Sequence, residues 1–341
     1  MSTNLVPLSN NLYGEMVDGY LIVSAQIQDP SNIQVVLKES DAGEPDQSLK
    51  SDSDYLTRII SYVPNDLKKN DGFNKSQWKG VGDIKSVILI KEKKGVSLTD
   101  IFSVSEKGRP FEDISKPRSE WDDYTRRGNH LRMIGERAYA VGSLRKLFRR
   151  DGVGNWTDLT DPEQHPNLFK RLKFLKERDG GYSNSYAGFR DVDGFNETDI
   201  YAGGRRDLWR YDGERWHEIQ LPQYPSISSV VCAKDDYVYV VGRNGPLLRG
   251  REDDWEVIDI PALDYNEMTW FDDKLWLASD YELGVYENGE YHRYEFPAGG
   301  PAQYSFNGVH SCDDMLLSYG LEQVLLFDGE EWVELIGSLS I

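Results

Sequence analysis

A repeated segment limits the possible folds of this chain more than any other feature of its sequence. The clearest copy is TDIYAGGRRDLWRYDGERWHEIQLP, residues 198–222. Each copy has an apolar strand, a glycine-like break, a second short apolar strand, a turn such as Asp-Gly or Asn-Gly, and an aromatic residue that opens a third strand. The other copies span residues 137–159, 236–261, 274–297 and 315–336. The segment is therefore a building block rather than a single site.

The spacing of the copies indicates a β-propeller. Their aligned aromatic residues are separated by 60, 39, 36 and 41 residues, and the long first gap indicates an insertion. A period of about 40 residues with several short strands per repeat is typical of propeller blades. A β-sandwich does not repeat in this way, and the repeats of a β-solenoid are usually shorter. We expect the aligned residues to pack between neighbouring blades; they are Trp156, Trp216, Trp255, Tyr291 and Trp332.

A further strand precedes the repeats, so each unit is predicted to be a blade of four antiparallel strands. These first strands lie at residues 130–135, 229–236, 267–273 and 307–314. Five clear blades result between residues 130 and 337.

The prediction for the whole chain is a single all-β domain over residues 1–341, a β-propeller of seven four-stranded blades. Residues 1–129 hold the degenerate blades, with hairpins expected at residues 19–39 and 85–101. Six blades are the alternative, if residues 1–60 provide only a closing strand. The acidic, aperiodic segment 39–54 is predicted to be a mobile loop.

The repeat resembles a bacterial propeller repeat of the form DVYAVGxxGxLxHYDGxxWxxI. Residues 199–219, DIYAGGRRDLWRYDGERWHEI, match it closely, and the other copies match it loosely over about three fifths of the chain. The turns YDGERW (211–216) and FDGEEW (327–332) are also similar to the Asp-box of sialidase-type propellers, with altered spacing and without its serine. The Asp-box is a structural turn. The resemblance therefore implies a fold and transfers no catalytic residue.

The acidic composition restricts the classes of partner. The chain has 39 basic and 58 acidic residues, for a net charge of −19. This argues against nucleic acid as a partner, because phosphates require clustered Lys and Arg. We expect no membrane association, because no apolar run reaches the roughly 18 residues of a spanning helix. The N-terminal segment lacks the pattern of a signal peptide, and the two cysteines form no disulfide framework, so a cytoplasmic location is expected.

Strand alternation predicts where the charges lie. In an antiparallel blade, the turns after the first and third strands share one rim, and the other connections share the opposite rim. The first rim should be acidic and should bind a basic protein, although Asp is also a common turn residue. The proposed partner-binding residues are Asp235, Asp236, Asp253, Asp254, Asp272, Asp273, Asp313 and Asp314. The alternative binding face is the opposite rim, with Arg145, Arg205, Arg206 and Arg243.

The insertion at residues 161–190 is a third candidate contact region. Leucines at helical spacing and flanking Pro166 and Gly180 predict a short helix there. This helix either packs on an edge of the propeller or forms a basic arm that contacts a partner through Lys170, Arg171 and Lys173.

The motifs of common enzymes and cofactor sites are missing. The five histidines are scattered without metal-ligand spacing, and the segment DVDGFNETD (191–199) lacks the acidic positions of a calcium loop. Cys232 and Cys312 lie on first strands and are expected to be buried free thiols. We therefore predict no catalytic residue, no metal and no cofactor.

These observations favour a non-enzymatic, protein-binding propeller that is monomeric when free. By analogy with the bacterial repeat, and from its charge, we expect an immunity protein that neutralises a basic toxin domain, delivered by contact-dependent or type VI secretion. Two alternatives remain open. One is a carbohydrate-binding or glycan-cleaving propeller, which would expose aromatic residues and paired carboxylates at its centre. The other is a scaffold subunit of a larger assembly.

Overall fold

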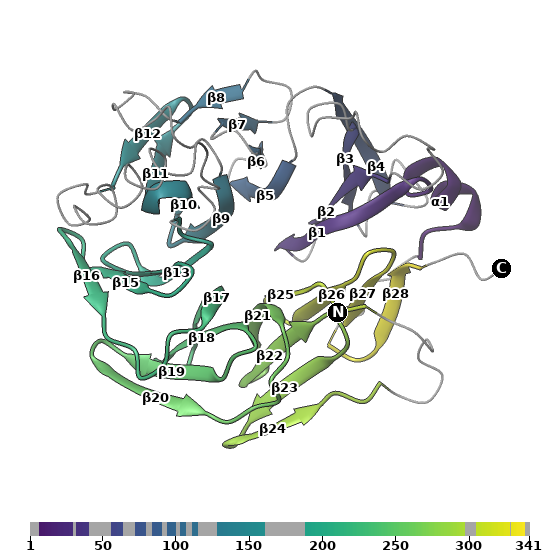
Figure 1. The fold of residues 1–341 in the computed structure, drawn as a ribbon. Helices are drawn as coiled ribbons and strands as arrows, with labels where there is room; N and C mark the ends of the chain where they lie inside the picture. The colour runs from purple at the N-terminus through teal and green to yellow at the C-terminus, as the bar shows by residue number, and fades with distance from the viewer. Residues whose placement is uncertain are drawn as a thin grey trace, which may run out of the picture. The chain divides into compact units, whose positions relative to one another are not determined.

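The computed structural model of the protein describes residues 7–29, 32–40, 56–63, 72–79, 84–90, 94–99, 103–106, 111–114, 128–160, 188–296, 305–327 and 329–337. Its described strands form seven four-stranded sheets, in each of which strands consecutive along the chain lie side by side (Figure 1). We number them sheet 1 to sheet 7 in chain order.

The first three sheets come from the N-terminal part of the chain. Sheet 1 contains β1 (Tyr20–Asp29), β2 (Asn32–Glu39), β3 (Leu56–Tyr62) and β4 (Phe73–Lys79); sheet 2 contains β5 (Ile84–Ile90), β6 (Lys94–Thr99), β7 (Ser103–Glu106) and β8 (Phe111–Asp113); sheet 3 contains β9 (Gly128–Ile134), β10 (Arg137–Gly142), β11 (Lys146–Gly152) and β12 (Asn155–Asp158). The strands at 20–39 confirm the hairpin predicted at residues 19–39.

The repeated part of the sequence supplies the other sheets. Sheet 4 contains β13 (Asp191–Asn196), β14 (Asp199–Gly203), β15 (Leu208–Tyr211) and β16 (Trp216–Ile219); sheet 5 contains β17 (Ser226–Cys232), β18 (Val238–Arg243), β19 (Leu247–Arg251) and β20 (Asp254–Ile258); sheet 6 contains β21 (Tyr265–Phe271), β22 (Lys274–Ser279), β23 (Leu283–Glu287) and β24 (Glu290–Arg293); sheet 7 contains β25 (Gly308–Cys312), β26 (Met315–Tyr319), β27 (Val324–Phe327) and β28 (Trp332–Ile336). The predicted order of four antiparallel strands per repeat is confirmed in these sheets.

The chain divides into two compact units. The first comprises Met1–Ile88 and Leu263–Ile341, with sheets 1, 6 and 7, and the second comprises Leu89–Ala262, with sheets 3, 4 and 5. Strand β5 of sheet 2 crosses the boundary between them.

Hydrophobic pattern decides the depth of each strand within its sheet. Most residues of the second strands are apolar and buried, and every residue of β14 (DIYAG) and of β26 (MLLSY) is buried. The fourth strands alternate or are polar: β20 and β24 have no buried residue. The second strand is thus covered on both faces, whereas the fourth strand borders solvent.

Turn residues connect these strands as their types require. Asn288 and Gly289 join β23 to β24, and both have positive φ, 52° and 86°. This is the geometry of a two-residue hairpin turn, which Asn-Gly favours.

Three of the five aligned aromatic residues bond to the preceding sheet, which confirms the predicted packing between sheets for them. The indole N–H groups of Trp156, Trp216 and Trp332 donate to Glu112 Oε2 (2.7 Å), Leu159 O (2.9 Å) and the Tyr294 hydroxyl (2.9 Å). The other two residues bond within their own sheets, Trp255 to Glu252 O and Tyr291 to Glu282 Oε1.

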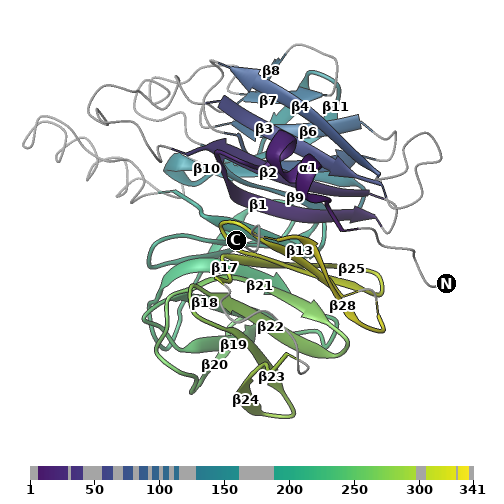
Figure 2. The same cartoon turned by 90° about the vertical axis from the view of Figure 1, so that its right-hand side faces the viewer.

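In the first unit, the beginning and the end of the described chain pack together. The Leu8 N–H donates to Leu335 O at 2.9 Å, and the Ile22 N–H donates to Leu321 O at 2.8 Å. One apolar cluster joins residues of sheet 1, such as Leu37, to residues of sheet 7, such as Leu317. Helix α1 (Asn10–Met16), which was not predicted, lies against sheet 1 in both Figures 1 and 2, and Arg58 of β3 donates to its Met16 carbonyl.

Candidate protein-binding surfaces

The structure places seven of the eight predicted acidic residues in connections between strands and Asp254 at the start of β20, and all eight are exposed. In the second unit, Asp235 and Asp236 lie in the β17–β18 turn. Asp253 lies in the β19–β20 turn and Asp254 opens β20. Both turns lie at the same end of sheet 5, because its strands are antiparallel. In the first unit, Asp272 and Asp273 join β21 to β22, and Asp313 and Asp314 join β25 to β26. We call these eight residues the acidic turns.

Backbone geometry explains part of this acidity. Asp272 and Asp273 both have positive φ, 51° and 55°, in a two-residue connection between Phe271 and Lys274. Asp236 and Asp313 also have positive φ, 67° and 51°. Asp tolerates this left-handed region better than most residues. The second aspartate of the Asp272–Asp273 pair therefore has a conformational role that the sequence analysis did not assign to it.

Arginines link the turns of sheets 4 and 5. Arg251 donates to Asp199 Oδ2 at 2.6 Å and to Asp236 O at 3.1 Å, and its guanidinium lies 3.8 Å from the Phe195 ring centroid. Arg210 donates to the other oxygen of the buried Asp199 carboxylate at 2.7 Å. Asp199 is thus neutralised locally. Among the described residues, no ion pair involves Asp235, Asp236, Asp253 or Asp254, so these four contribute the net negative charge of this end.

Asp235 and Asp212 are also held by local hydrogen bonds. Asp235 accepts from the Tyr239 hydroxyl at 2.7 Å. Asp212 of the YDGERW turn accepts from the backbone N–H groups of Glu214 and Arg215 and lies 2.7 Å from His217 Nε2. These hydrogen bonds, that of the Arg215 N–H first, lower the pKa of Asp212. The turn is a structural cap, as the Asp-box resemblance implies.

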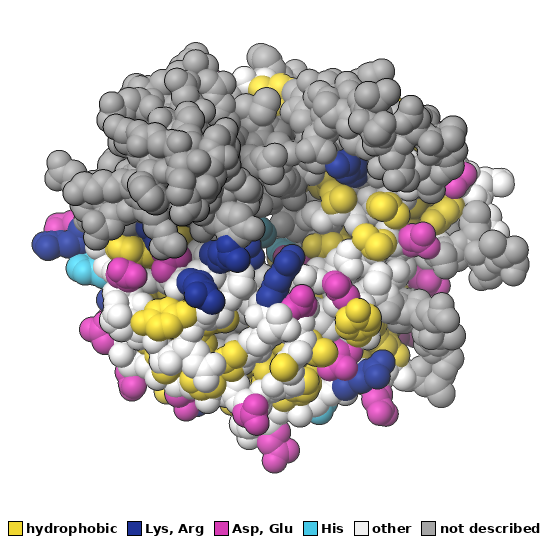
Figure 3. Space-filling model, viewed as in Figure 1, with side chains coloured by type: hydrophobic (Ala, Val, Ile, Leu, Met, Phe, Trp, Pro, Cys, Tyr) yellow, Lys and Arg dark blue, Asp and Glu magenta, His cyan; other side chains and the backbone are white. Residues whose placement is uncertain are grey.

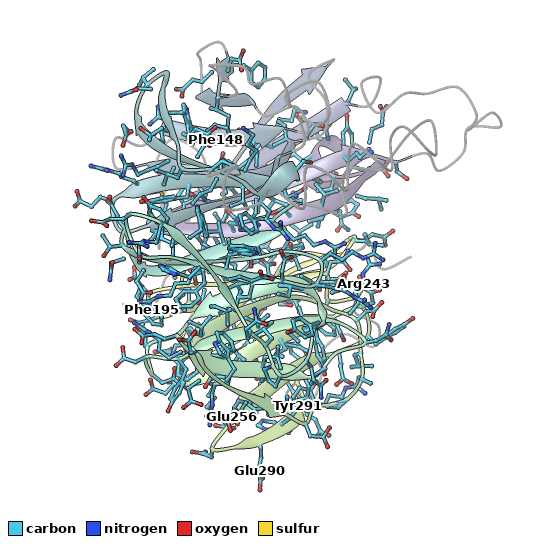
Figure 4. All side chains as sticks on the ribbon, turned by 60° about the vertical axis from the view of Figure 1, so that its left-hand side comes forward. Phe148, Phe195, Arg243, Glu256, Glu290 and Tyr291 are labelled. Atoms are coloured by element: carbon cyan, nitrogen blue, oxygen red, sulfur yellow. The ribbon has the colours of Figure 1, made fainter. Side chains whose placement is uncertain are left out.

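The four predicted arginines lie at the opposite end of their sheets. Arg145 is part of a short 3-10 turn (Ser143–Arg145) after β10, Arg205 and Arg206 lie between β14 and β15, and Arg243 ends β18. Figure 4 shows this opposition within the second unit, with Arg243 and Phe195 at opposite edges of the sheets. In the face shown in Figure 3, Lys and Arg side chains gather over β13 and β17.

Arg145 differs from the other three arginines. Its guanidinium forms an ion pair with Asp207 and lies 5.3 Å from the Trp209 ring centroid, and the Trp209 N–H also donates to Asp207. Arg145 is therefore part of the packing between sheets 3 and 4. Arg205, Arg206 and Arg243 are exposed.

Two residues at the same end were missed by the sequence analysis. Arg190 donates from Nη1 to Ser226 Oγ at 3.3 Å, and Tyr224 lies in the connection from β16 to β17 with 51% of its surface exposed. Tyr224 stands out only because the structure exposes its large hydrophobic side chain. The repeat pattern of the sequence does not show this exposure. In the first unit, Tyr281 is exposed in the connection between β22 and β23 of sheet 6.

The other predicted sites lie outside the described residues or lack reactive groups. The basic residues of the insertion, Lys170, Arg171 and Lys173, belong to the segment 161–187, which lies outside the described ranges. Of the loop predicted at residues 39–54, Glu39 ends strand β2, and residues 41–54 likewise lie outside the described ranges. No group of acidic, His or Cys residues among the described ones could hold a metal ion. No described helix is long and apolar enough to cross a membrane.

Both cysteines are free, but they are half-buried rather than buried as predicted. Burial raises the pKa of Cys232, and burial with neighbouring Asp313 raises the pKa of Cys312 to about 11. Both groups therefore remain thiols at neutral pH, which does not suit a nucleophile.

No protein-family model matches the chain. Among curated proteins, the Immune protein Tsi7 of Pseudomonas aeruginosa is 29% identical over 201 residues, which cover 58% of this chain and 60% of Tsi7. Among solved structures, the WD40 β-propeller domain of Doa1 has a TM-score of 0.57 at 11% identity, over 94% of this chain and 97% of that one. PorZ, a surface component of the type IX secretion system of Porphyromonas gingivalis, has a TM-score of 0.57 at 10% identity, over 96% of this chain and 39% of PorZ.

The chain has the β-propeller fold. The predicted all-β propeller is thereby confirmed, while the number of its blades and the bacterial form of its repeat stay predictions. The chain spans about three fifths of the length of Tsi7, the curated relative that it matches.

The first strands of the propeller sheets in the second unit carry a charged network around the buried carboxylate of Asp191. Asp191 of β13 accepts from the Val230 N–H of β17 at 2.8 Å and from Ser229 Oγ at 3.2 Å, and its carboxylate lies 3.6 Å from both His130 Nε2 and Arg132 Nη2 of β9. The next acid on β13, Asp193, accepts from the Cys232 N–H at 3.0 Å. Segment DVDGFN is therefore a strand that connects neighbouring sheets. Its aspartates are superficially similar to those of a calcium loop, and the sequence does not indicate this role.

His130 is expected to make the fold sensitive to acid. Burial is the largest cause and lowers the pKa of His130 from its ordinary 6.5. The negative charge of Asp191 opposes this effect, and the positive charge of Arg132 adds to it, so the pKa is lowered. The folded state thus binds this proton less readily than the unfolded state does, so stability falls as the pH drops below about 6.5. Burial raises the pKa of Asp193, so the folded state binds a proton there more readily than the unfolded state does. Protonation of Asp193 at lower pH therefore opposes the loss of stability caused by His130.

Replacing His130 by Gln should therefore reduce the loss of melting temperature between about pH 7.5 and pH 5.5. The same replacement at the exposed His292 serves as the control. An unchanged pH profile in the His130 variant would contradict this role.

Proposed function

We propose that this chain is an immunity protein, which binds a protein toxin and neutralises it. The observation that carries the proposal is the 29% identity to the Immune protein Tsi7 over 201 residues. The propeller fold supports it, because strand connections at both ends of the sheets present surfaces to a partner. The relative also favours a non-enzymatic role.

Finer features of this proposal follow from the sequence. The seven sheets would be seven blades of one propeller, with six as the alternative. The toxin would be a basic domain delivered by contact-dependent or type VI secretion, and the immunity protein would act in the cytoplasm as a monomer. The acidic turns would face this toxin. With a net charge of −19, the protein would attract a basic partner and speed its capture.

Co-production tests the function directly. We expect the toxin to be encoded by a gene next to that of this protein, and its product should arrest cells when it is produced alone. It should be harmless when this protein is present, and the two purified proteins should form a stoichiometric complex. Continued arrest with both proteins folded, or the lack of a complex, would overturn the proposal.

The acidic turns are tested within the same complex by charge reversal. The variant D235K/D236K/D272K/D273K is expected to lower the association rate at low salt by about tenfold or more and to flatten its salt dependence. The matched control reverses four exposed acids in connections at the opposite ends of sheets 5, 6 and 7, Asp259, Asp280, Glu295 and Glu322. Equal rates for the two variants would show that overall charge, and not the acidic turns, guides the partner.

A further inference from the structure

The large hydrophobic side chains that are exposed in the first unit gather at one end of its sheets. Among the described residues of this unit they are Val23, Tyr281 and Leu321, with 42%, 76% and 43% of their surfaces exposed. Tyr281 lies in the β22–β23 connection and Leu321 in the β26–β27 connection. A single exposed hydrophobic residue is common on protein surfaces, whereas a group of them marks an interaction site.

Val23 lies beside Leu321. The Ile22 N–H donates to Leu321 O at 2.8 Å, which joins β1 to the β26–β27 connection. The register of β1 with β2 shifts between Ile22 and Ser24, so Val23 is the extra residue of a β-bulge and has no register partner in β2. A bulge redirects a side chain, and that of Val23 is exposed between two buried neighbours.

Tyr281 belongs to the same end. Tyr319, the last residue of β26, donates from its hydroxyl to Glu267 Oε2 at 3.1 Å. Glu267 is the register partner of Ala278, near the end of β22. The β22–β23 and β26–β27 connections therefore start from neighbouring positions of sheets 6 and 7.

The backbone of these connections does not require hydrophobic residues. In sheets 4, 6 and 7, the N–H of the first residue of the connection donates to the carbonyl of the fourth: Gly204 to Asp207 at 2.8 Å, Ser279 to Glu282 at 3.0 Å, and Gly320 to Gln323 at 3.0 Å. The two residues between them are Arg205 and Arg206 in sheet 4, Asp280 and Tyr281 in sheet 6, and Leu321 and Glu322 in sheet 7. The same turn thus forms with two polar residues in sheet 4, and turns usually contain polar residues or glycine. The fold does not account for the exposed side chains of Tyr281 and Leu321.

Each of these two hydrophobic residues has an acid next to it in the chain. Asp280 accepts from the uncharged Asn266 side chain at 2.7 Å. Burial first, and then the negative charges of Glu322 and Asp18, raise the pKa of Tyr13 in α1. Among the described residues, Asp18, Asp280 and Glu322 belong to no ion pair, so their charges remain available to a partner. We call Val23, Asp280, Tyr281, Leu321 and Glu322 the tip surface.

We propose that the tip surface binds a segment of a second protein, distinct from the toxin, in which basic side chains alternate with large hydrophobic ones. The hydrophobic side chains of the segment would be buried against Val23, Tyr281 and Leu321. Its lysines or arginines would lie beside Asp280 and Glu322, where charge complementarity selects a basic segment over an acidic one. This inference rests on the proposed function only in placing the toxin at the acidic turns.

Strand length separates the tip surface from the acidic turns. In sheet 6, Asp272 and Asp273 precede β22, and Asp280 and Tyr281 follow it. The strand contains six residues. At about 3.3 Å per residue, its two ends lie about 20 Å apart. A toxin domain bound at the acidic turns therefore leaves the tip surface accessible, and the two partners can bind at the same time.

The first test uses a fluorescein-labelled peptide of alternating Lys and Leu and measures fluorescence anisotropy. The wild-type protein should bind this peptide. A peptide with Ser in place of Leu keeps the charge and should bind at least about tenfold more weakly, because it has no side chains to bury. A peptide with Glu in place of Lys keeps the hydrophobic residues and should also bind at least about tenfold more weakly.

Two variants locate the binding site of the Lys-Leu peptide. The variant V23S/Y281S/L321S should bind it at least about tenfold more weakly than the wild type does. The control V153S/Y224S/Y237S removes three similarly exposed hydrophobic side chains of the second unit and should keep the affinity of the wild type. Neither variant changes the net charge, so a difference between them reports the hydrophobic part of the tip surface. Thermal melting checks that both variants fold.

Charge reversal tests the acidic part of the tip surface. The variant D280K/E322K should bind the Lys-Leu peptide more weakly than D313K/D314K does. The second variant makes the same change in net charge at exposed residues of an acidic turn.

Four outcomes would overturn the inference. The wild type could fail to bind the Lys-Leu peptide, or it could bind the Lys-Ser peptide equally well, which would leave only general attraction between charges. The two serine variants could also bind the Lys-Leu peptide equally. Equal affinities of the two charge-reversal variants would likewise show that overall charge, and not the tip surface, holds the peptide.

The toxin of the proposed function separates the two proposals. It should bind V23S/Y281S/L321S as tightly as the wild type, and its complex with the wild type should still bind the Lys-Leu peptide. A toxin that displaces the peptide, or that binds this variant more weakly, would itself occupy the tip surface, so the inference of a second protein would fail while the immunity function stands. If the toxin does not bind the wild type at all, the proposed function fails, whereas the peptide results are unaffected.

Discussion

Replacing Trp216 by Ala is expected to lower the free energy of unfolding by about 4 kcal/mol. Trp216 is buried, and its ring lies 5.4 Å from that of Phe189 and 5.3 Å from that of Tyr211. Its N–H donates across to Leu159 O at the end of sheet 3. The substitution would leave a large cavity between two sheets and an unpaired carbonyl group. Denaturant unfolding, followed by tryptophan fluorescence and circular dichroism, measures the loss.

Trp255 provides the matched control for this change. It occupies the same repeat position, but it is only half-buried and its N–H donates to Glu252 O in its own turn. Its replacement by Ala should cost roughly 1–2 kcal/mol. Equal costs at the two positions would mean that the packing between sheets 3 and 4 contributes less than the structure indicates.

The second large effect is expected from Asp191→Ala, which should destabilise the protein by about 3 kcal/mol. The change removes the acceptor of the Val230 N–H and leaves Arg132 and His130 beside an apolar methyl group. A buried charge without its partner costs more than the pair itself contributes. The thermal midpoint and the denaturant midpoint should both fall.

Two further variants define the cause. Asp191→Asn keeps the size and one acceptor oxygen, so a smaller loss than that of Asp191→Ala would assign the difference to charge. Asp254→Ala, at an exposed turn residue, should change stability by no more than about 0.5 kcal/mol. If Asp191→Ala costs as little as Asp254→Ala, the network does not hold sheets 4 and 5 together.

Much of the propeller could be predicted because its signals are local. Asn288-Gly289 and the apolar run of β26 predict a turn and a buried strand from the residues themselves. Strand β13 could not be predicted in the same way. Its aspartates resemble a loop, and they are stable in a strand only because the N–H groups of β17 lie within hydrogen-bond distance. Tertiary contacts between sheets supply that information, and the local sequence does not contain it.

The candidate surfaces show the same division. The alternation of strands predicted that Asp235 and Arg243 would lie at opposite ends of one sheet, and the structure places them there. The sequence did not distinguish Arg145 from its neighbours, because the ion pair with Asp207 joins two repeats. It also did not indicate Arg190, whose place depends on its bond to Ser226 in the next sheet.

The packing of sheet 1 on sheet 7 has a consequence for synthesis on the ribosome. Leu37 leaves the ribosome nearly 300 residues before Leu326, one of the residues that cover the same apolar cluster. Throughout translation, sheet 1 lacks the surface that buries its core. Its apolar residues stay accessible to chaperones and to other nascent chains until sheet 7 is released, so the fold is completed only after translation of that sheet ends.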